Sequence, residues 1–335
     1  MTVTALEATA TEVALSVQGL HVEIDVRRGP PLQPVRGVSF EVKRGRRAGI
    51  VGESGSGKSL TALALMRLLP PRARIASGSI QLAGRELTSL TEREMAATRG
   101  GGVSLVYQDP MSSLNPLQPV GHQVREAILA HENVGKKEAS TRVVDLLRDV
   151  GIPHPERRVD DYPHEFSGGM RQRVMIAMAI STNPTLLIAD EATTALDVTT
   201  QARIMDLLGR IVDERQMGMI LITHDLGLAA AFCDEIHVMY AGRLVEAGPA
   251  DALFARPAHP YSAALLESIC TLDRDIDRPI TAISGQPPLL QAIPAGCPFH
   301  PRCTRAEADC TTELPPTVES GDRMVECHHP IGASA

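Results

Sequence analysis

Hydrophobic and polar residues alternate along two stretches near the beginning of the chain. Residues 13–26 and 35–43 both show this period of two, which is typical of strands with one buried face. The segment between them, residues 27–34, carries glycine and proline and predicts a turn, so we expect the two strands to lie antiparallel. A second hairpin is predicted from residues 236–240 and 243–247.

Four other runs are apolar without alternation, a pattern that indicates strands buried on both faces. They cover residues 46–51, 103–108, 186–191 and 219–225, and a shorter strand is expected at residues 79–82. The last three of the four runs end in polar side chains and alternate with helical segments. This order predicts an α/β fold with a mainly parallel sheet and a ligand at the carboxyl ends of its strands.

Apolar residues recur at helical spacing between these strands. Residues 120–131 and 138–150 predict two helices within a helical insert at about residues 109–165. Residues 201–216 predict an amphipathic helix. A further helix begins at Ser167, which is a natural N-cap residue.

Composition and charge narrow the possible functions. A length of 335 residues suggests roughly two domains. The net charge of −7 and the 3% of aromatic residues disfavour binding to nucleic acid. Residues 1–12 lack a basic start and an apolar segment, so they are expected to be disordered rather than a signal peptide. No apolar run reaches the roughly 20 residues of a membrane span. From about residue 256, proline, cysteine and histidine become frequent and indicate a C-terminal extension.

A glycine-rich phosphate loop is the strongest chemical signal in the chain. It follows the strand at residues 46–51, precedes a helix, and has the pattern G-x-x-x-x-G-K-S. The glycines let backbone N–H groups point at phosphate oxygens, while Lys58 is expected to reach the β- and γ-phosphates and Ser59 to bind Mg²⁺. The alternative is a glycine turn without a ligand. The predicted site comprises Gly52, Glu53, Ser54, Gly55, Ser56, Gly57, Lys58, Ser59 and Leu60.

Polar residues at the ends of the other apolar strands supply what hydrolysis of a magnesium nucleotide requires. Asp190 is expected to hold Mg²⁺, and Glu191 to orient and polarise the attacking water. Gln108 could complete the Mg²⁺ shell, and His224 could bond the γ-phosphate. The structural alternatives are acidic residues at an ordinary turn and a histidine without a catalytic role.

A second anion site is predicted at Ser167, Gly168 and Gly169, where a serine cap and two glycines open a helix. A chain with two phosphate sites either binds two nucleotides or lends one site to a neighbouring subunit. The second interpretation predicts a head-to-tail dimer with ATP between the subunits.

These motifs, taken in order, resemble the nucleotide-binding subunits of ABC transporters over about residues 13–250. The resemblance implies a P-loop (RecA-like) cassette at residues 13–255, with an antiparallel β subdomain and a helical subdomain, and then a Cys-rich extension at residues 256–335. It implies that ATP and Mg²⁺ are the cofactors and that Glu191 and His224 are catalytic. It also implies that the signature residues, Ser167, Gly168, Gly169 and Met170, contact the ATP of the opposite subunit, and that Asp197 crosses the dimer interface.

Four segments narrow the resemblance to the importers of dipeptides, oligopeptides and nickel. They are residues 107–116, 162–166, 170–179 and 259–261, and the Met-containing signature helix is similar to the DppD/OppD-type subunit. This resemblance implies a heterodimer with a second, F-type ATPase subunit, two transmembrane permease subunits and an extracytoplasmic solute-binding protein. The chain would be peripheral on the cytoplasmic face of the bacterial cell membrane and would not contact the solute.

The chain departs from this family at two positions. The family usually has an aromatic residue on the first hairpin that stacks on adenine, whereas this chain offers Ile24, which gives apolar contact only. Ala192 replaces the usual proline after the catalytic glutamate.

Four cysteines gather near the C-terminus, at Cys297, Cys303, Cys310 and Cys327. Thiolates suit Zn²⁺ or an iron–sulfur cluster, and free or disulfide-bonded thiols are the third possibility. The matching tail of the resembled importers is associated with a [4Fe–4S] cluster, which is the expectation for this chain. The histidines nearby could replace a ligand or be solvated: His300, His328 and His329. The isolated Cys233 and Cys270 are expected to be packing residues.

The sequence thus predicts an ATPase that energises a peptide importer. The same motor could serve nickel or another small solute. A soluble ABC ATPase that acts on nucleic acid or ribosomes fits an acidic chain with a single cassette poorly, and a regulator that does not hydrolyse ATP is disfavoured by Glu191 and His224.

Overall fold

The computed structural model describes residues 12–109, 113–194, 196–268 and 283–332. The predicted disordered N-terminus lies almost wholly outside these residues, as does Cys270. The chain divides into two compact units. The first consists of residues 1–15, 41–46 and 81–220, and the second of residues 16–40, 47–80 and 221–335.

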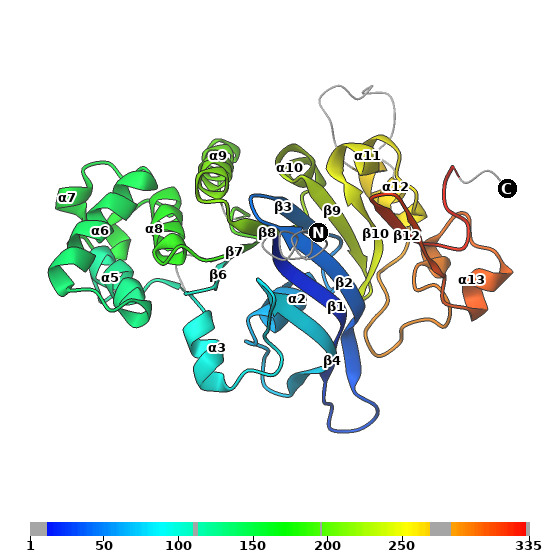
Figure 1. Cartoon of the computed structure of the whole chain (residues 1–335). Coiled ribbons are helices and arrows are strands. Elements are labelled where there is room, and N and C mark those ends of the chain that lie inside the picture. Colours follow the sequence, from blue (N-terminus) through cyan, green and yellow to red (C-terminus); the bar gives the residue numbers. More distant parts are fainter. Residues whose placement is uncertain (1–11, 110–112, 195, 269–282, 333–335) are drawn as a thin grey trace, which may run out of the picture. The chain divides into compact units, whose positions relative to one another are not determined.

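The first unit contains a helical region and buried strands (Figure 1). Its helices include the two predicted in the insert, and the first of them has the predicted bounds. In chain order its elements are β5 (Arg85–Glu86), α3 (Glu92–Thr98), β6 (Val103–Val106), α5 (Val120–His131), α6 (Lys136–Asp149), α7 (Pro155–Arg158), the 3₁₀-helix η1 (Pro163–Glu165), α8 (Gly168–Ile180), β7 (Leu186–Asp190) and α9 (Val198–Arg215). Strand β8 (Gly218–Thr223) then leads into the second unit.

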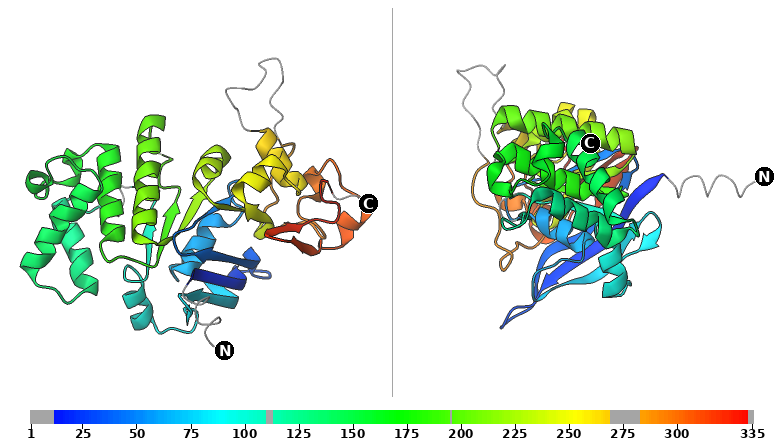
Figure 2. Two further views of the ribbon diagram at one scale, coloured as in Figure 1. Left: turned by 45° about the horizontal axis from the view of Figure 1, so that its top comes forward. Right: turned by 90° about the vertical axis from the view of Figure 1, so that its left-hand side faces the viewer.

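Helices α5, α6 and α8 pack against one another through apolar faces (Figures 1 and 2). Val124 and Ile128 of α5 and Val143 and Leu147 of α6 are at most 1% exposed. The apolar residues of both helices therefore lie in the core of this helical region. Strands β6 and β7 pair in parallel, with Val103 opposite Leu186, as the apolar runs predict.

The second unit contains most of β1 (Val13–Ile24), β2 (Leu32–Lys43) and β4 (Ala73–Leu82), and these are neighbours in one sheet in the order β2-β1-β4. The predicted turn lies two to three residues earlier than expected, since β1 ends at residue 24 rather than 26 and β2 starts at residue 32 rather than 35. The other elements of this unit are β3 (Arg47–Val51), α2 (Lys58–Leu65), α10 (Leu226–Phe232), β9 (Glu235–Tyr240), β10 (Arg243–Pro249), α11 (Ala250–Ala255), α12 (Pro260–Glu267), the 3₁₀-helix η2 (His300–Arg302), α13 (Ala308–Thr312), β11 (Thr317–Ser320) and β12 (Arg323–Glu326).

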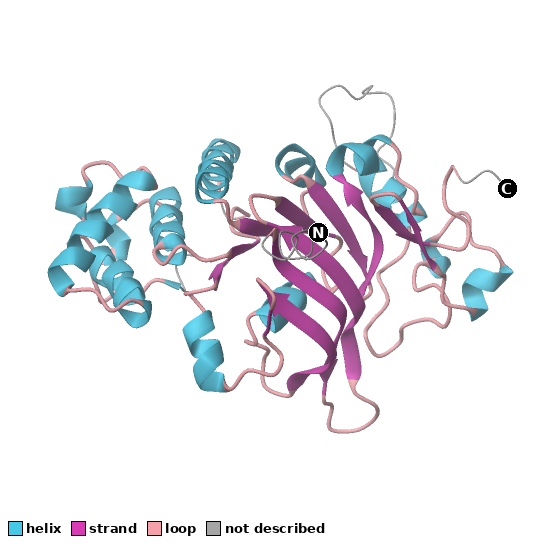
Figure 3. Cartoon of the chain, in the orientation of Figure 1, coloured by secondary structure: helices cyan, strands magenta, loops and turns pink. Residues whose placement is uncertain are grey.

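Strands of this unit are neighbours in a second sheet, in the order β11-β12-β10-β9-β3. Figure 3 draws the strands in magenta. Strands β3 and β9 are parallel, and β9 and β10 form the predicted hairpin. The C-terminal strands β11 and β12 were not predicted, because this proline-rich segment has few apolar residues. Strand β12 pairs antiparallel with β10, with Glu246 opposite Val325, so the extension continues the sheet.

The core consists of apolar strands with little exposed surface. In β7, Leu186, Leu187 and Ile188 are fully buried, and in β9 Ile236 and Val238 are as well. Among the described residues, no helix combines the length and apolar character needed to cross a membrane.

Candidate nucleotide-binding site

The phosphate loop connects β3 to α2 and depends on glycine for its path. Gly52 has φ 151° and Gly57 has φ 110°, which are conformations that residues with a side chain rarely adopt. A Cβ atom at Gly52 would lie 2.1 Å from the carbonyl oxygen of Met239, and one at Gly57 would lie 2.4 Å from that of Pro34. The loop therefore requires glycine for both backbone angle and space.

The side chain of Lys58 folds back onto the beginning of the phosphate loop. Its Nζ donates to the carbonyl oxygens of Gly52, at 2.8 Å, and of Glu53, at 3.0 Å, and the residue is 6% exposed. The ammonium group thus lies among the carbonyl groups of the residues that would surround a phosphate. Ser59 follows on the first turn of α2 and is exposed, and Leu60 is half-buried.

The amino end of α2 has no side-chain cap. Its N-cap is Gly57, which has no side chain to accept a hydrogen bond from the first turn. The leading N–H groups of a helix need partners, and they favour an anion. The local fold therefore suits the phosphate ligand that the motif predicts.

Gln108 and Glu191 are brought together in the first unit, although 83 residues separate them. Nε2 of Gln108 donates to Oε2 of Glu191 at 3.0 Å. Glu191 follows β7 with φ 48°, which is uncommon for a residue other than glycine. Its carbonyl oxygen accepts hydrogen bonds from the N–H and the hydroxyl of Thr194. This turn supports an unfavourable backbone angle at the predicted catalytic residue, as functional sites often do.

Asp190 is the last residue of β7 and is half-buried, whereas the apolar residues before it are fully buried. A carboxylate at the carboxyl end of a buried strand is a suitable oxygen ligand for Mg²⁺. Its predicted role in binding the metal stays a prediction, as does that of Ser59.

The signature helix α8 begins as predicted. Ser167 is its N-cap, and the hydroxyl oxygen accepts the N–H of Met170 at 3.4 Å. A Cβ atom at Gly169 would lie 2.6 Å from Cγ2 of Thr200, whereas one at Gly168 would approach only Leu196, at 3.7 Å. The second glycine therefore allows α8 and α9 to approach closely, and the first has no such packing role.

Asp197 is the N-cap of α9, a role that the sequence did not suggest. Its Oδ1 accepts the N–H of Thr200 at 3.0 Å. Hydrogen bonds from Thr200 lower the pKa of the Asp197 carboxyl below its usual value. Asp197 is exposed, so its predicted place at a dimer interface stays a prediction.

His224 follows β8 in the second unit and is exposed. Asp225, the next residue, caps α10 by accepting the N–H of Leu228 at 2.9 Å, which fixes the backbone after the strand. Ile24 ends β1 and is half-buried. The contacts predicted for His224 with phosphate and for Ile24 with adenine stay predictions.

The four predicted cysteine ligands line one small cavity in the second unit, together with His259 and other residues. Cys297, Cys310 and Cys327 are buried, and Cys303 is half-buried. All four are free thiols. Burial raises the pKa of the Cys327 thiol to about 11 and also raises the pKa values of the Cys297 and Cys310 thiols. A metal would have to displace these protons to bind.

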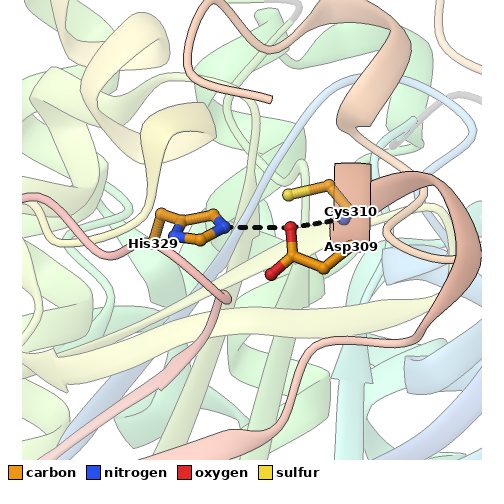
Figure 4. Close-up of side chains that lie close together, drawn as sticks. All are labelled: Asp309, Cys310 and His329. Atoms are coloured by element: carbon orange, nitrogen blue, oxygen red, sulfur yellow. Dashed lines mark hydrogen bonds and ion pairs between the residues drawn. The ribbon is translucent and has the colours of Figure 1, made fainter. Parts of the chain in front are cut away.

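His259 lines this cavity, and Asp309, which the sequence did not single out, precedes the lining residue Cys310. Asp309 adjoins Cys310, and its Oδ1 is 3.0 Å from Nε2 of His329 (Figure 4). The ligand atoms of Asp309, Cys310 and His329 lie within 4.8 Å of one another. The hydrogen bond between Asp309 and His329 raises the pKa of His329 and lowers that of Asp309. His259 is fully buried, and its Nε2 has no hydrogen-bond partner in the described part of the chain.

The remaining isolated cysteine is a packing residue, as predicted. Cys233 is 7% exposed, and burial raises the pKa of its thiol to about 12, so it stays protonated. Its Sγ would lie 3.0 Å from a Cβ atom at Gly49 in β3.

Comparison with known proteins is consistent with these motifs. A family model described as ABC transporter matches residues 35–194, and one described as the C-terminal region of oligopeptide/dipeptide transporters matches residues 245–310. The dipeptide transport ATP-binding protein DppD of Bacillus subtilis (strain 168) is 46% identical over 94% of this chain and 94% of its own length. The oligopeptide transport ATP-binding protein OppD of Salmonella typhimurium is 46% identical over 97% of this chain and 98% of its own.

Solved structures resemble the same part of the fold. The ABC transporter component cbiO1 from Clostridium perfringens matches 73% of this chain and 91% of its own, with a TM-score of 0.63 and 27% identity. The dimeric ABC cassette MJ0796 matches 70% of this chain and 98% of its own, with a TM-score of 0.62; at 24% identity it supports the fold alone. The chain belongs to the ABC transporter family, as an ATP-binding protein of the type that carries the oligopeptide/dipeptide transporter C-terminal region.

Proposed function

We propose that this chain hydrolyses ATP to drive the import of peptides by a multisubunit transporter. The observation that carries the hydrolytic part is the hydrogen bond from Gln108 to Glu191 at the end of β7. This bond supports the proposal because it orients the carboxylate that the family pattern assigns to polarising the attacking water.

The motifs assign a proposed role to each residue of the site. In the second unit, Lys58 and the N–H groups of the loop would bind the phosphates, Ser59 would bind Mg²⁺, and His224 would bond the γ-phosphate. In the first unit, Asp190 and Gln108 would supply oxygen ligands to Mg²⁺, and Glu191 would orient water. When bound, Mg²⁺ neutralises charge on the phosphate oxygens.

The test of hydrolysis is Glu191→Gln in the assembled transporter. We expect ATP to bind with near-normal affinity while turnover falls by roughly 100-fold or more, because a general base typically contributes that much. Glu214→Gln is the matched control, since Glu214 is an exposed glutamate of α9 that pairs with Arg210. Normal turnover in the Glu191 variant would remove this residue from catalysis.

The signature residues Ser167, Gly168, Gly169 and Met170 are proposed to contact ATP held by a second, F-type ATPase subunit, with Asp197 at the interface. Two transmembrane permease subunits and an extracytoplasmic solute-binding protein complete the assembly, and the chain lies on the cytoplasmic face of the membrane. The native mass of the purified complex tests this proposal. We expect one copy of this chain and one of the second ATPase, and two copies of this chain would contradict the heterodimer.

Peptides are the proposed solute class because the relatives are named for dipeptide and oligopeptide transport. Nickel chelates and other small solutes are the alternative. Mass spectrometry of the ligand retained by the solute-binding protein of the same transporter distinguishes them: a bound di- or oligopeptide supports the proposal, and a metal chelate overturns it.

The Cys-rich extension is proposed to hold a [4Fe–4S] cluster on Cys297, Cys303, Cys310 and Cys327, with Zn²⁺ as the alternative. The four cysteines line one small cavity, which supports a metal or cluster shared among them. Thiolates suit either group. The N–H of Arg305 points to Sγ of Cys303 at 3.4 Å, a contact that stabilises a cluster-bound thiolate.

Metal and sulfide analysis of anaerobically purified protein tests this assignment. We expect about four iron and four sulfide per chain, and their loss in Cys327→Ser. One zinc per chain without sulfide would establish the alternative, and protein free of both would contradict either metal.

A further inference from the structure

An ion pair within the second unit joins the phosphate loop to the Cys-rich extension. Glu53 is the second residue of the loop, and its carboxylate receives both ends of the Arg302 guanidinium. Nη1 of Arg302 lies 2.6 Å from Oε2 of Glu53, and Nη2 lies 3.0 Å from Oε1. The pair spans 249 residues of sequence, and nothing in the phosphate-loop motif requires it.

Arg302 is fixed before any ligand arrives. Its side chain is 4% exposed, whereas that of Glu53 is 27% exposed. Nε of Arg302 donates to the carbonyl oxygen of Ser284 at 2.9 Å, and Nη1 approaches Oη of Tyr240 at 3.3 Å. The guanidinium also lies 6.0 Å from the ring centre of Phe299. A planar guanidinium held at both ends is well suited to a bidentate bond with a carboxylate.

A second contact holds the backbone of the same loop residue. The N–H of Glu53 donates to Oη of Tyr261, in α12, at 2.9 Å. Tyr261 is fully buried and packs against Tyr240, with ring centres 4.5 Å apart, and against Phe299, at 5.3 Å. Arg302 and Tyr261 therefore hold both the side chain and the backbone of Glu53 from residues C-terminal to β10.

The charge of Glu53 matters because the loop is proposed to bind a triphosphate. A carboxylate beside polyanionic phosphate repels it, and this repulsion is strong where protein replaces water. The bond to Arg302 offsets that negative charge and keeps the carboxylate directed toward the extension. We propose that Arg302 is a positioning residue for ATP binding, which acts from the Cys-rich extension by neutralising Glu53 and directing its carboxylate toward the extension. This inference rests on the proposed function, since it assumes that the loop binds ATP.

The test compares ATP affinities of the full-length chain and three variants by titration with a fluorescent ATP analogue. Arg302→Met leaves Glu53 unpaired and is expected to weaken binding roughly tenfold at low salt, and less at 0.5 M salt because exposed charges are screened. Glu53→Gln alone is expected to bind ATP at least as well as the wild type. The double variant with both changes is expected to recover to within about threefold of the wild type.

Recovery of ATP affinity in the double variant distinguishes an electrostatic effect of Arg302 from a purely structural one. A guanidinium that only supports the structure would leave the double variant as weak as Arg302→Met. Arg256→Met is the matched control, since Arg256 is an exposed arginine of the same unit, and it is expected to bind ATP normally. Thermal melting of each variant checks that the chain is folded. If Arg302→Met does not fold, Glu53→Arg supplies the second measurement: binding that is unchanged or stronger supports the charge argument, and tenfold weaker binding overturns it.

The outcomes also distinguish this inference from the proposed function. If the wild-type chain fails to bind the ATP analogue, the proposed function fails. If the wild type binds and Arg302→Met binds equally well, or the double variant shows no recovery, only the role of Arg302 is overturned.

Discussion

The amino ends of α2 and α8 both begin at glycine-rich anion motifs, but they are stabilised differently. Helix α2 starts at Gly57, which supplies no side-chain cap, whereas α8 starts at Ser167, whose hydroxyl accepts the N–H of Met170. The phosphate loop thus begins its helix without a side-chain cap, an arrangement that suits an anion at the helix amino end. The signature helix is capped by a side chain of its own motif.

The glycines of the two motifs also have different roles. Gly52 is required by its φ and by the nearby backbone of Met239, so it fixes the shape of the loop. Gly169 is required by packing against Thr200. Gly168 has room for a methyl group within its own unit, so packing does not require glycine there. The proposed contact with ATP is the reason that we offer for glycine at this position.

The largest expected effect comes from adding one methyl group to each motif. Gly52→Ala would place Cβ 2.1 Å from a backbone oxygen at φ 151°, and we expect it to lower the free energy of unfolding by about 3 kcal/mol or more and to abolish ATP binding. Gly168→Ala meets only Leu196, at 3.7 Å, and should change stability by less than about 0.5 kcal/mol. Urea unfolding measures the stability of each variant, and titration measures its ATP binding. Equal stabilities of Gly52→Ala and Gly168→Ala would contradict the different roles of the two glycines.

The stability of the second unit is expected to depend on pH through His237, which lies in β9 opposite Ile50 of β3. His237 is buried against Phe40, and its two ring nitrogens have no hydrogen-bond partner among the described residues. Burial lowers the pKa of His237 from 6.5 to about 4. Below pH 6.5 the unfolded chain takes up a proton that the folded chain does not, so stability falls with pH until about pH 4.

At pH 5 this difference amounts to about 2 kcal/mol. His237→Leu should therefore lose about 2 kcal/mol less than the wild type between pH 7.5 and pH 5, measured by urea unfolding at both values. Val238→Ala, also buried in β9, is the control: it should lower stability at both values and keep the wild-type dependence on pH. If His237→Leu lost as much unfolding free energy as the wild type between pH 7.5 and pH 5, burial of His237 would not be the cause of the pH dependence.

The smallest expected effect is at the cap of α8. Ser167→Ala should cost about 0.5 kcal/mol, the low end for an N-cap, because the bond to Met170 is long at 3.4 Å. Thr91→Ala, at the cap of α3, should cost about 1 kcal/mol, since Thr91 and Glu94 form a complete capping box. Chemical denaturation resolves the two, and a cost above about 2 kcal/mol for Ser167→Ala would mean that the hydroxyl does more than cap the helix.

Local patterns predicted much of the fold and the site. Helix α5 has the predicted bounds, Ser167 is the predicted cap, and the hairpin of β9 and β10 is present. Boundaries were less accurate: α9 begins at Val198 rather than residue 201, and β4 begins at Ala73 rather than residue 79. Periodicity identifies the buried face of an element, but helix and strand ends depend on neighbours that the local sequence does not reveal.

The sequence by itself determined the parts of this protein whose physics is local. The order of glycines, Lys58 and Ser59 predicts a phosphate loop, and the carboxylates at the end of β7 predict a site for Mg²⁺, because each pattern depends on residues adjacent in the chain. Only the tertiary structure decided the long-range contacts: Gln108 with Glu191, Arg302 with Glu53, and the pairing of β12 with β10. Such contacts depend on how distant segments fold together, and no short pattern encodes that partner choice.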